Sequence, residues 1–92
     1  MFKIIEITTP TCSVCKMLKP MLAKAMESFS DVEMMVLDHQ DEVALKMAEN
    51  YSIRTVPAFF FMKDDLVIDT HYGAITMPDF KNKINMLKNN GC

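Results

Sequence analysis

The chain has 92 residues, half of them apolar, and a formal net charge of −2. This length suits one domain, residues 1–92, with one hydrophobic core. The balanced charge argues against a nucleic-acid surface, and the longest apolar stretch, Val56–Met62, is too short to span a membrane. Met1–Ile7 includes an acid and lacks a signal-peptide layout. We therefore expect the protein to stay in the cytoplasm, where structural disulfides are rare. We also expect it to be a monomer.

The first part of the chain predicts two strands joined by a helix. Phe2–Thr8 is rich in β-branched residues and indicates a buried strand. From Cys12 onward, apolar residues recur at the spacing of one helix face. These residues are Val14, Leu18, Met21, Leu22, Ala25 and Phe29. Pro20 lies inside this helix and is expected to kink it or to begin a new segment. Val32–Leu37 then indicates a second strand.

A second helix and a β-hairpin follow. Asp38 or Asp41 can cap this helix. Its apolar stripe consists of Ala44, Met47, Ala48 and Tyr51. Val56–Met62 is predicted to be a strand with Pro57 at its start, where a strand tolerates proline. After a polar turn, Leu66–His71 is predicted to pair back with it.

The last helix completes an α/β pattern. Thr76 is predicted to cap it, with Asp79 three residues on. Its buried face comprises Phe80, Ile84 and Leu87. Asn89–Cys92 is expected to be a frayed tail. The order is therefore β-α-β-α-β-β-α. Because a helix joins the first two strands, they should be parallel with a right-handed crossover. With the antiparallel hairpin, this gives a four-stranded mixed sheet with helices on both faces.

Two cysteines stand between the first strand and the first helix, in Thr11-Cys12-Ser13-Val14-Cys15-Lys16. A Cys-x-x-Cys segment at a helix start brings two sulfurs within bonding reach. The helix N-terminus supplies free N–H groups and a positive dipole end, which stabilise a thiolate. Cys12 would lie exposed at the cap, and Cys15 one turn further would be shielded. We therefore expect Cys12 to attack a disulfide and Cys15 to resolve the mixed disulfide.

Metal binding is the weaker interpretation of this pair. Zinc and iron–sulfur sites generally use four ligands. The remaining soft donors are Cys92, His39 and His71, and none has ligand spacing. We expect no metal or cofactor, although a metal or iron–sulfur module built on the same cysteines remains an alternative. Both histidines are expected to be isolated and exposed, and Cys92 to be a spare thiol.

Over nearly its whole length the chain resembles the thioredoxin family. Three segments carry the resemblance: Cys12–Met17 with Pro20 beyond it, Tyr51–Pro57, and Tyr72–Thr76. The small size resembles glutaredoxins and the short glutaredoxin-like thioredoxins of some microbes. A glutathione-linked reductase is thus a further alternative, although Gly73 precedes alanine rather than the double glycine and acid that hold glutathione. Ser13-Val14 replaces the family's usual Gly-Pro, and Thr11 stands where tryptophan is common.

The resemblance implies a thioredoxin-like fold and a thiol–disulfide oxidoreductase that reduces protein disulfides. A thioredoxin-reductase-type donor would reload it, within electron transport and cell redox homeostasis. The resemblance also implies that Pro57 is cis and faces the cysteine pair, and that Val56 offers backbone groups to an extended substrate. Gly73 and Ala74 would form another wall of the groove, and Thr11 its near rim.

Glu6 lies six positions before Cys12, within an otherwise apolar strand. In the thioredoxin family a buried aspartate at this offset helps to move the proton of the resolving cysteine, which implies a general-base role for Glu6. The alternative is a partly exposed acid neutralised by a lysine. Lys16 and Lys19 are expected to be solvated, the alternative being that they stabilise a thiolate or attract an acidic partner.

Overall fold

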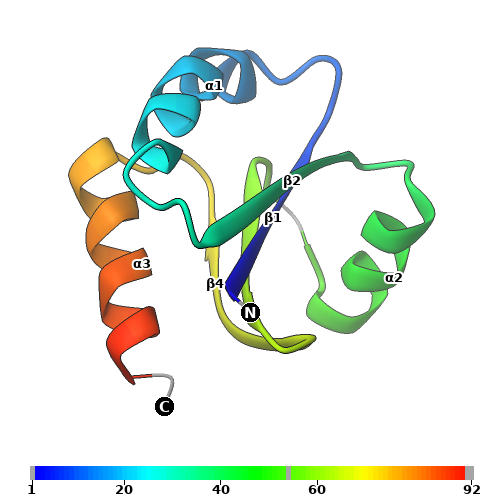
Figure 1. Cartoon of the computed structure of the whole chain (residues 1–92). Helices are drawn as coiled ribbons and strands as arrows, with labels where there is room; N and C mark the ends of the chain where they lie inside the picture. Colours follow the sequence, from blue (N-terminus) through cyan, green and yellow to red (C-terminus); the bar gives the residue numbers. More distant parts are fainter. Residues whose placement is uncertain (1, 54, 91–92) are drawn as a thin grey trace.

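The computed structural model describes residues 2–53 and 55–90, in which seven elements follow the predicted order (Figure 1). They are β1 (Phe2–Thr8), α1 (Ser13–Met26), β2 (Val32–Asp38), α2 (Glu42–Tyr51), β3 (Ala58–Lys63), β4 (Leu66–Tyr72) and α3 (Met77–Asn90). Residue 54, within the Tyr51–Pro57 segment, and Cys92 lie outside the described residues.

The four strands form one mixed sheet in the order β2-β1-β3-β4. β1 pairs in parallel with β2, with Phe2 opposite Val32, as strands joined by a helix should. β3 runs antiparallel to both β1 and β4. The predicted mixed sheet is confirmed, with β1 and β3 as its central strands.

Helices cover both faces of this sheet, with α1 and α3 on one side and α2 on the other (Figure 1). Successive side chains of a strand point to opposite faces, so the central strands supply both cores. Phe59 and Phe61 join the core beneath α1 and α3, whereas Phe60 joins the core beneath α2. All three phenylalanines are fully buried. The cysteines lie at one end of these strands, and the packed sheet therefore holds that end in place.

Polar caps start the last two helices. Asp41 caps α2, and its Oδ1 accepts the N–H of Val43 at 2.9 Å. Asp38, the other candidate cap, ends β2 instead. At the start of α3 the Thr76 hydroxyl accepts the N–H of Asp79 at 3.2 Å, as predicted. These contacts satisfy N–H groups that the helices leave unpaired.

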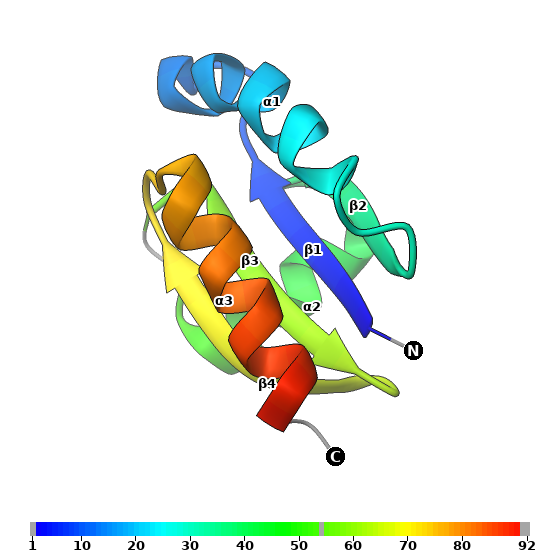
Figure 2. The ribbon, with the colours of Figure 1, turned by 60° about the vertical axis from the view of Figure 1, so that its left-hand side comes forward.

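Two sequence expectations near the cysteines are corrected. β3 begins at Ala58 rather than at Val56, because Pro57 has no N–H to give to the sheet. Val14, which the helical spacing places on the same face as Leu22 and Ala25, does not share their burial and is 39% exposed, and the first turn of α1 extends beyond the end of β1 (Figure 2). α1 itself runs without interruption through Pro20.

The expected frayed tail, Asn89–Cys92, is corrected in its first part, because α3 continues through Asn90, whereas residues 91–92 lie outside the described residues. Lys88, in its last turn, pairs with Asp31 and lies 5.7 Å from the centre of the Phe29 ring. These contacts tie the end of α3 to the segment between α1 and β2. Across residues 2–53 and 55–90, every helix is too short or too polar to cross a membrane.

Candidate active site

Cys12 and Cys15 form a disulfide at the N-terminus of α1, with their Cα atoms 5.3 Å apart. Cys12 is the N-cap residue, and its Sγ accepts the N–H of Cys15 at 3.1 Å. No acidic side chain stands in the first turn of α1. The positive end of the helix is therefore not offset there, which favours a thiolate at Cys12 once the disulfide is reduced. Cys12 is partly exposed, whereas Cys15 is 7% exposed.

The loop before β3 lies beside this pair. The Val56–Pro57 peptide bond is cis, and the Val56 carbonyl oxygen lies 3.9 Å from Cys12 Sγ. The Pro57 carbonyl accepts the N–H of Gly73 at 2.8 Å. Three segments far apart in the sequence thus converge at one end of the sheet. The expectation of a cis bond at Pro57, beside the cysteines, is confirmed.

The other expected groove residues lie around this centre. Thr11 is exposed in the turn just before Cys12, and Ala74 is exposed in the loop after β4. Gly73 is partly buried and has a φ of +96°, in the left-handed region that favours glycine. A substrate role for these residues stays a prediction.

Glu6 is buried at the centre of the sheet, with 3% of its surface exposed. It lies opposite Val36 of β2 and Phe59 of β3. Within the described part of the chain, its Oε2 atom has no hydrogen-bond partner. Burial penalises the charged form and raises the pKa of Glu6 from 4.5 to about 7. The interpretation of Glu6 as a partly exposed acid is therefore wrong.

Glu6 and Cys15 line the same pocket, which has a volume of about 230 Å³. Lys16 and Lys19 of α1 also line it, and both are exposed to solvent as expected. Cys15 and Glu6 therefore face one space, and the pocket connects this space to water.

A second hollow of about 360 Å³ lies beside Val56, and sequence reasoning missed it. Its lining is mostly apolar: Ile7, Ala44, Leu45, Ala48, Ile53 and Val56, with Thr9 and His39. Leu45 is 53% exposed and lies off the buried stripe of α2. The one signal for this hollow in the sequence was a leucine off the apolar stripe of the predicted helix, and single apolar residues on a surface are common.

The contacts of His71 were also missed, because His71 was expected to be isolated and exposed. Its ring is half-buried, and its Nε2 lies 3.0 Å from the carbonyl oxygen of Ala74. The ring also packs against Phe59, with 6.1 Å between ring centres. His39 is exposed as expected, and its Nδ1 lies 3.3 Å from Asp38. Among the described residues, no three His, Cys, Asp or Glu side chains are grouped to hold a metal ion.

A Cys-x-x-Cys disulfide at a helix start, beside a cis-proline loop on a four-stranded sheet, defines a thiol–disulfide oxidoreductase with a thioredoxin-like fold. The sequence model of the thioredoxin family matches residues 2–86. The chain therefore belongs to the thioredoxin family.

Curated relatives agree with this assignment, and solved structures agree with the fold. Thioredoxin 1 of Synechococcus elongatus is 27% identical over 82 residues, covering 89% of this chain and 76% of that protein. Thioredoxin H5 of Arabidopsis thaliana is 28% identical over 90 residues, covering 96% and 70%. The fold matches oxidised mitochondrial thioredoxin 3 of Saccharomyces cerevisiae with a TM-score of 0.79 at 24% identity, covering 94% and 78%. It matches a thioredoxin-like protein of Clostridium perfringens with a TM-score of 0.82 at 19% identity, covering 95% and 71%.

Proposed function

We propose that this protein reduces protein disulfides by dithiol–disulfide exchange, with Cys12 as nucleophile and Cys15 as resolving residue. The Cys12 thiolate attacks one substrate sulfur, forms a mixed disulfide and expels the other sulfur as a thiolate. The Cys15 thiolate then attacks Cys12 Sγ, which forms the Cys12–Cys15 disulfide and releases the first substrate sulfur. Two electrons pass from the dithiol to the substrate, and two substrate thiols result.

The observation that carries this proposal is the unequal placement of the two sulfurs at one helix start. Cys12 is partly exposed at the cap, where a large substrate can reach it, and Cys15 is buried one turn further. A partly exposed thiolate at a helix N-terminus is the reactive type, whereas a buried thiol in apolar surroundings is inert towards bulky reagents. The proposed order of attack therefore follows from the solvent exposure of the two sulfurs as well as from the positive end of the helix.

Glu6 is proposed as the base that takes the proton of Cys15 during resolution. Support comes from the pocket that both residues line and from the pKa of Glu6, which burial raises to about 7. A base with a pKa near the working pH exchanges protons in both directions with little penalty. Water in the pocket would pass the proton onward, past Lys16 and Lys19 at its lining.

The substrate is proposed to bind as an extended segment across the loops around Cys12. Val56 would pair with it through its backbone, a form of strand addition. Pro57, Gly73 and Ala74 would line the groove, with Thr11 at its rim. The apolar hollow beside Val56 would accept a large apolar side chain near the substrate cysteine.

For the cellular setting we propose a single-domain cytoplasmic monomer, residues 1–92, that acts in electron transport and redox homeostasis. A thioredoxin-reductase-type donor would return it to the dithiol form. Glutathione as donor, which the sequence left open, is tested by supplying each reductant separately to the oxidised protein. Faster recovery of the two thiols with the reductase system is the expected result, and faster recovery with glutathione would overturn the choice of donor.

Stoichiometric reduction of insulin by the pre-reduced protein tests the proposed function. Wild type should lose two thiols as insulin gains two, and Cys12→Ser should be inactive. Cys92→Ser, which removes the thiol outside the Cys-x-x-Cys segment, serves as the matched control and should react normally. Normal insulin reduction by Cys12→Ser would overturn the proposal.

A further inference from the structure

The loop between β4 and α3 forms one wall of the proposed groove, and contacts at both of its ends hold it in place. At Gly73 the chain adopts a φ of +96°, and the Gly73 N–H donates to Pro57 at 2.8 Å. Ile75 is 7% exposed and anchors the far end of the loop in the core. Between these two anchors, Ala74 is exposed. Its carbonyl has a side-chain contact in addition to these two anchors.

His71 supplies that contact. Its Nε2 lies 3.0 Å from the Ala74 carbonyl oxygen. Because a carbonyl oxygen only accepts, this hydrogen bond places the ring proton on Nε2. The ring is fixed in turn by Phe59, whose ring centre is 6.1 Å away and which is fully buried in the central strand β3. A rigid part of the sheet is thus connected, through one side chain, to an exposed loop carbonyl.

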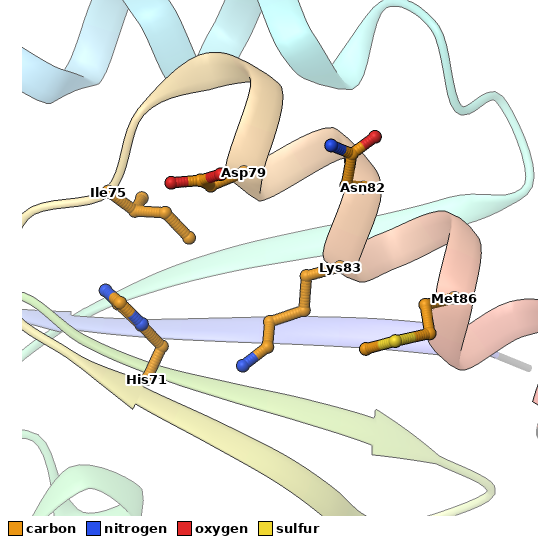
Figure 3. A pocket seen from close by; sticks show the side chains of 6 residues that line it. All are labelled: His71, Ile75, Asp79, Asn82, Lys83 and Met86. Atoms are coloured by element: carbon orange, nitrogen blue, oxygen red, sulfur yellow. The ribbon is translucent and has the colours of Figure 1, made fainter.

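The other side of the ring faces an open pocket between β4 and α3. Figure 3 shows His71 from β4 and Lys83 from α3 extending into this space, which has a volume of about 340 Å³. Lys83 is engaged elsewhere, since its Nζ lies 2.9 Å from Asp69.

We propose that His71 is a positioning residue for substrate recognition, which orients the Gly73–Ala74 wall through its hydrogen bond to the Ala74 carbonyl. This inference rests on the proposed function. A loop already held in its binding conformation loses less conformational entropy when an extended protein segment docks on it. A small disulfide that reaches Cys12 alone gains nothing from that wall. His71 therefore acts on the discrimination between substrates and not on the sulfur chemistry.

Three variants separate the hydrogen bond from the ring. His71→Phe keeps a ring against Phe59 but has no donor, whereas His71→Gln places an amide N–H at a similar reach. Asn82→Ala, which changes the same pocket from α3, is the matched control. Each pre-reduced protein is mixed with increasing concentrations of insulin and, separately, with dithionitrobenzoate as the small disulfide.

We expect His71→Phe to raise the half-saturating insulin concentration by about three- to tenfold, as the loss of one hydrogen bond implies. The maximal rate and the rate with dithionitrobenzoate should not change, and His71→Gln and Asn82→Ala should behave like wild type. An unchanged insulin half-saturation in His71→Phe, an equal loss on both substrates, or no rescue by His71→Gln would overturn the inference. Failure of the proposed function is distinct, since wild type itself would then leave insulin oxidised.

Amide hydrogen exchange of residues 73–76 provides a readout without substrate. Loss of the anchor should speed exchange in this segment about three- to tenfold in His71→Phe and not in Asn82→Ala. Equal exchange rates in His71→Phe and wild type would overturn the inference, even if a folding defect prevented the kinetic comparison.

Discussion

Replacing Glu6 by Gln should change how the stability of the oxidised protein depends on pH. The Glu6 side chain is buried in the central strand of the sheet, and burial raises its pKa from 4.5 to about 7. Between these values the unfolded chain loses the proton and the folded chain keeps it. The folded state then binds more protons than the unfolded state, so the free energy of unfolding falls as pH rises.

The size of this effect follows from the two pKa values. At about 1.4 kcal/mol per pKa unit, the change from 4.5 to about 7 corresponds to about 3 kcal/mol. The stabilisation is fully present below pH 4.5 and is lost by the time the pH exceeds about 7. Glu6→Gln has a similar shape and no titrating group. Relative to this variant, wild type should therefore become less stable by about 3 kcal/mol over that range.

Urea unfolding of oxidised wild type and Glu6→Gln, followed by circular dichroism from about pH 4 to about pH 8.5, measures this difference. Any constant offset from the buried amide is removed by comparing the two ends of the range. Glu33→Gln, which changes an exposed carboxyl on the edge strand β2, is the control for the loss of a carboxyl from the sheet. A flat difference for Glu6→Gln would refute a buried, proton-holding Glu6.

Three further predictions concern the stability of the oxidised protein in urea. Asp41→Ala removes the N-cap of α2 and should lower the free energy of unfolding by about 1 kcal/mol. Ile84→Ala, at a fully buried position of α3, should lower it by about 2–5 kcal/mol. Gly73→Ala leaves the nearest side-chain atom, on Thr55, 3.7 Å from the new Cβ but forces alanine to a φ of +96°, so we expect a loss of about 1–3 kcal/mol. A loss below about 0.5 kcal/mol, which is the usual scatter of surface substitutions, would contradict any of the three.

The elements whose patterns are local could be predicted from the sequence. Val56–Met62 is predicted to be a strand, and the structure has one from Ala58, with all three phenylalanines of the run Phe59–Phe61 buried. Thr76 with Asp79 indicates a helix start, and the predicted hydrogen bond is present. The cis bond at Pro57 came from resemblance to the thioredoxin family, because no local preference in Val56–Pro57 selects a conformation that is the minority state of such bonds.

The features that depend on packing between distant segments were missed or left open. Strand alternation could not decide whether Glu6 is buried, because β1 carries apolar residues on both faces and its neighbours were unknown. Val14 follows the helical spacing of the apolar stripe of α1 but lies in the first turn of the helix and is 39% exposed. The contact of His71 with Ala74 requires the conformation of a glycine-containing loop, which is fixed by a hydrogen bond to Pro57, a residue from another part of the chain.

Trapping with Cys15→Ser tests most directly whether this family member attacks protein disulfides through Cys12. Reduced Cys15→Ser is mixed with insulin, and the products are mapped by mass spectrometry after rapid acid quenching. We predict a covalent mixed disulfide between Cys12 and an insulin cysteine, because no second thiolate at position 15 releases it. Cys12→Ser should form no such adduct. An adduct through Cys15 in Cys12→Ser, with none through Cys12 in Cys15→Ser, would contradict the proposed mechanism.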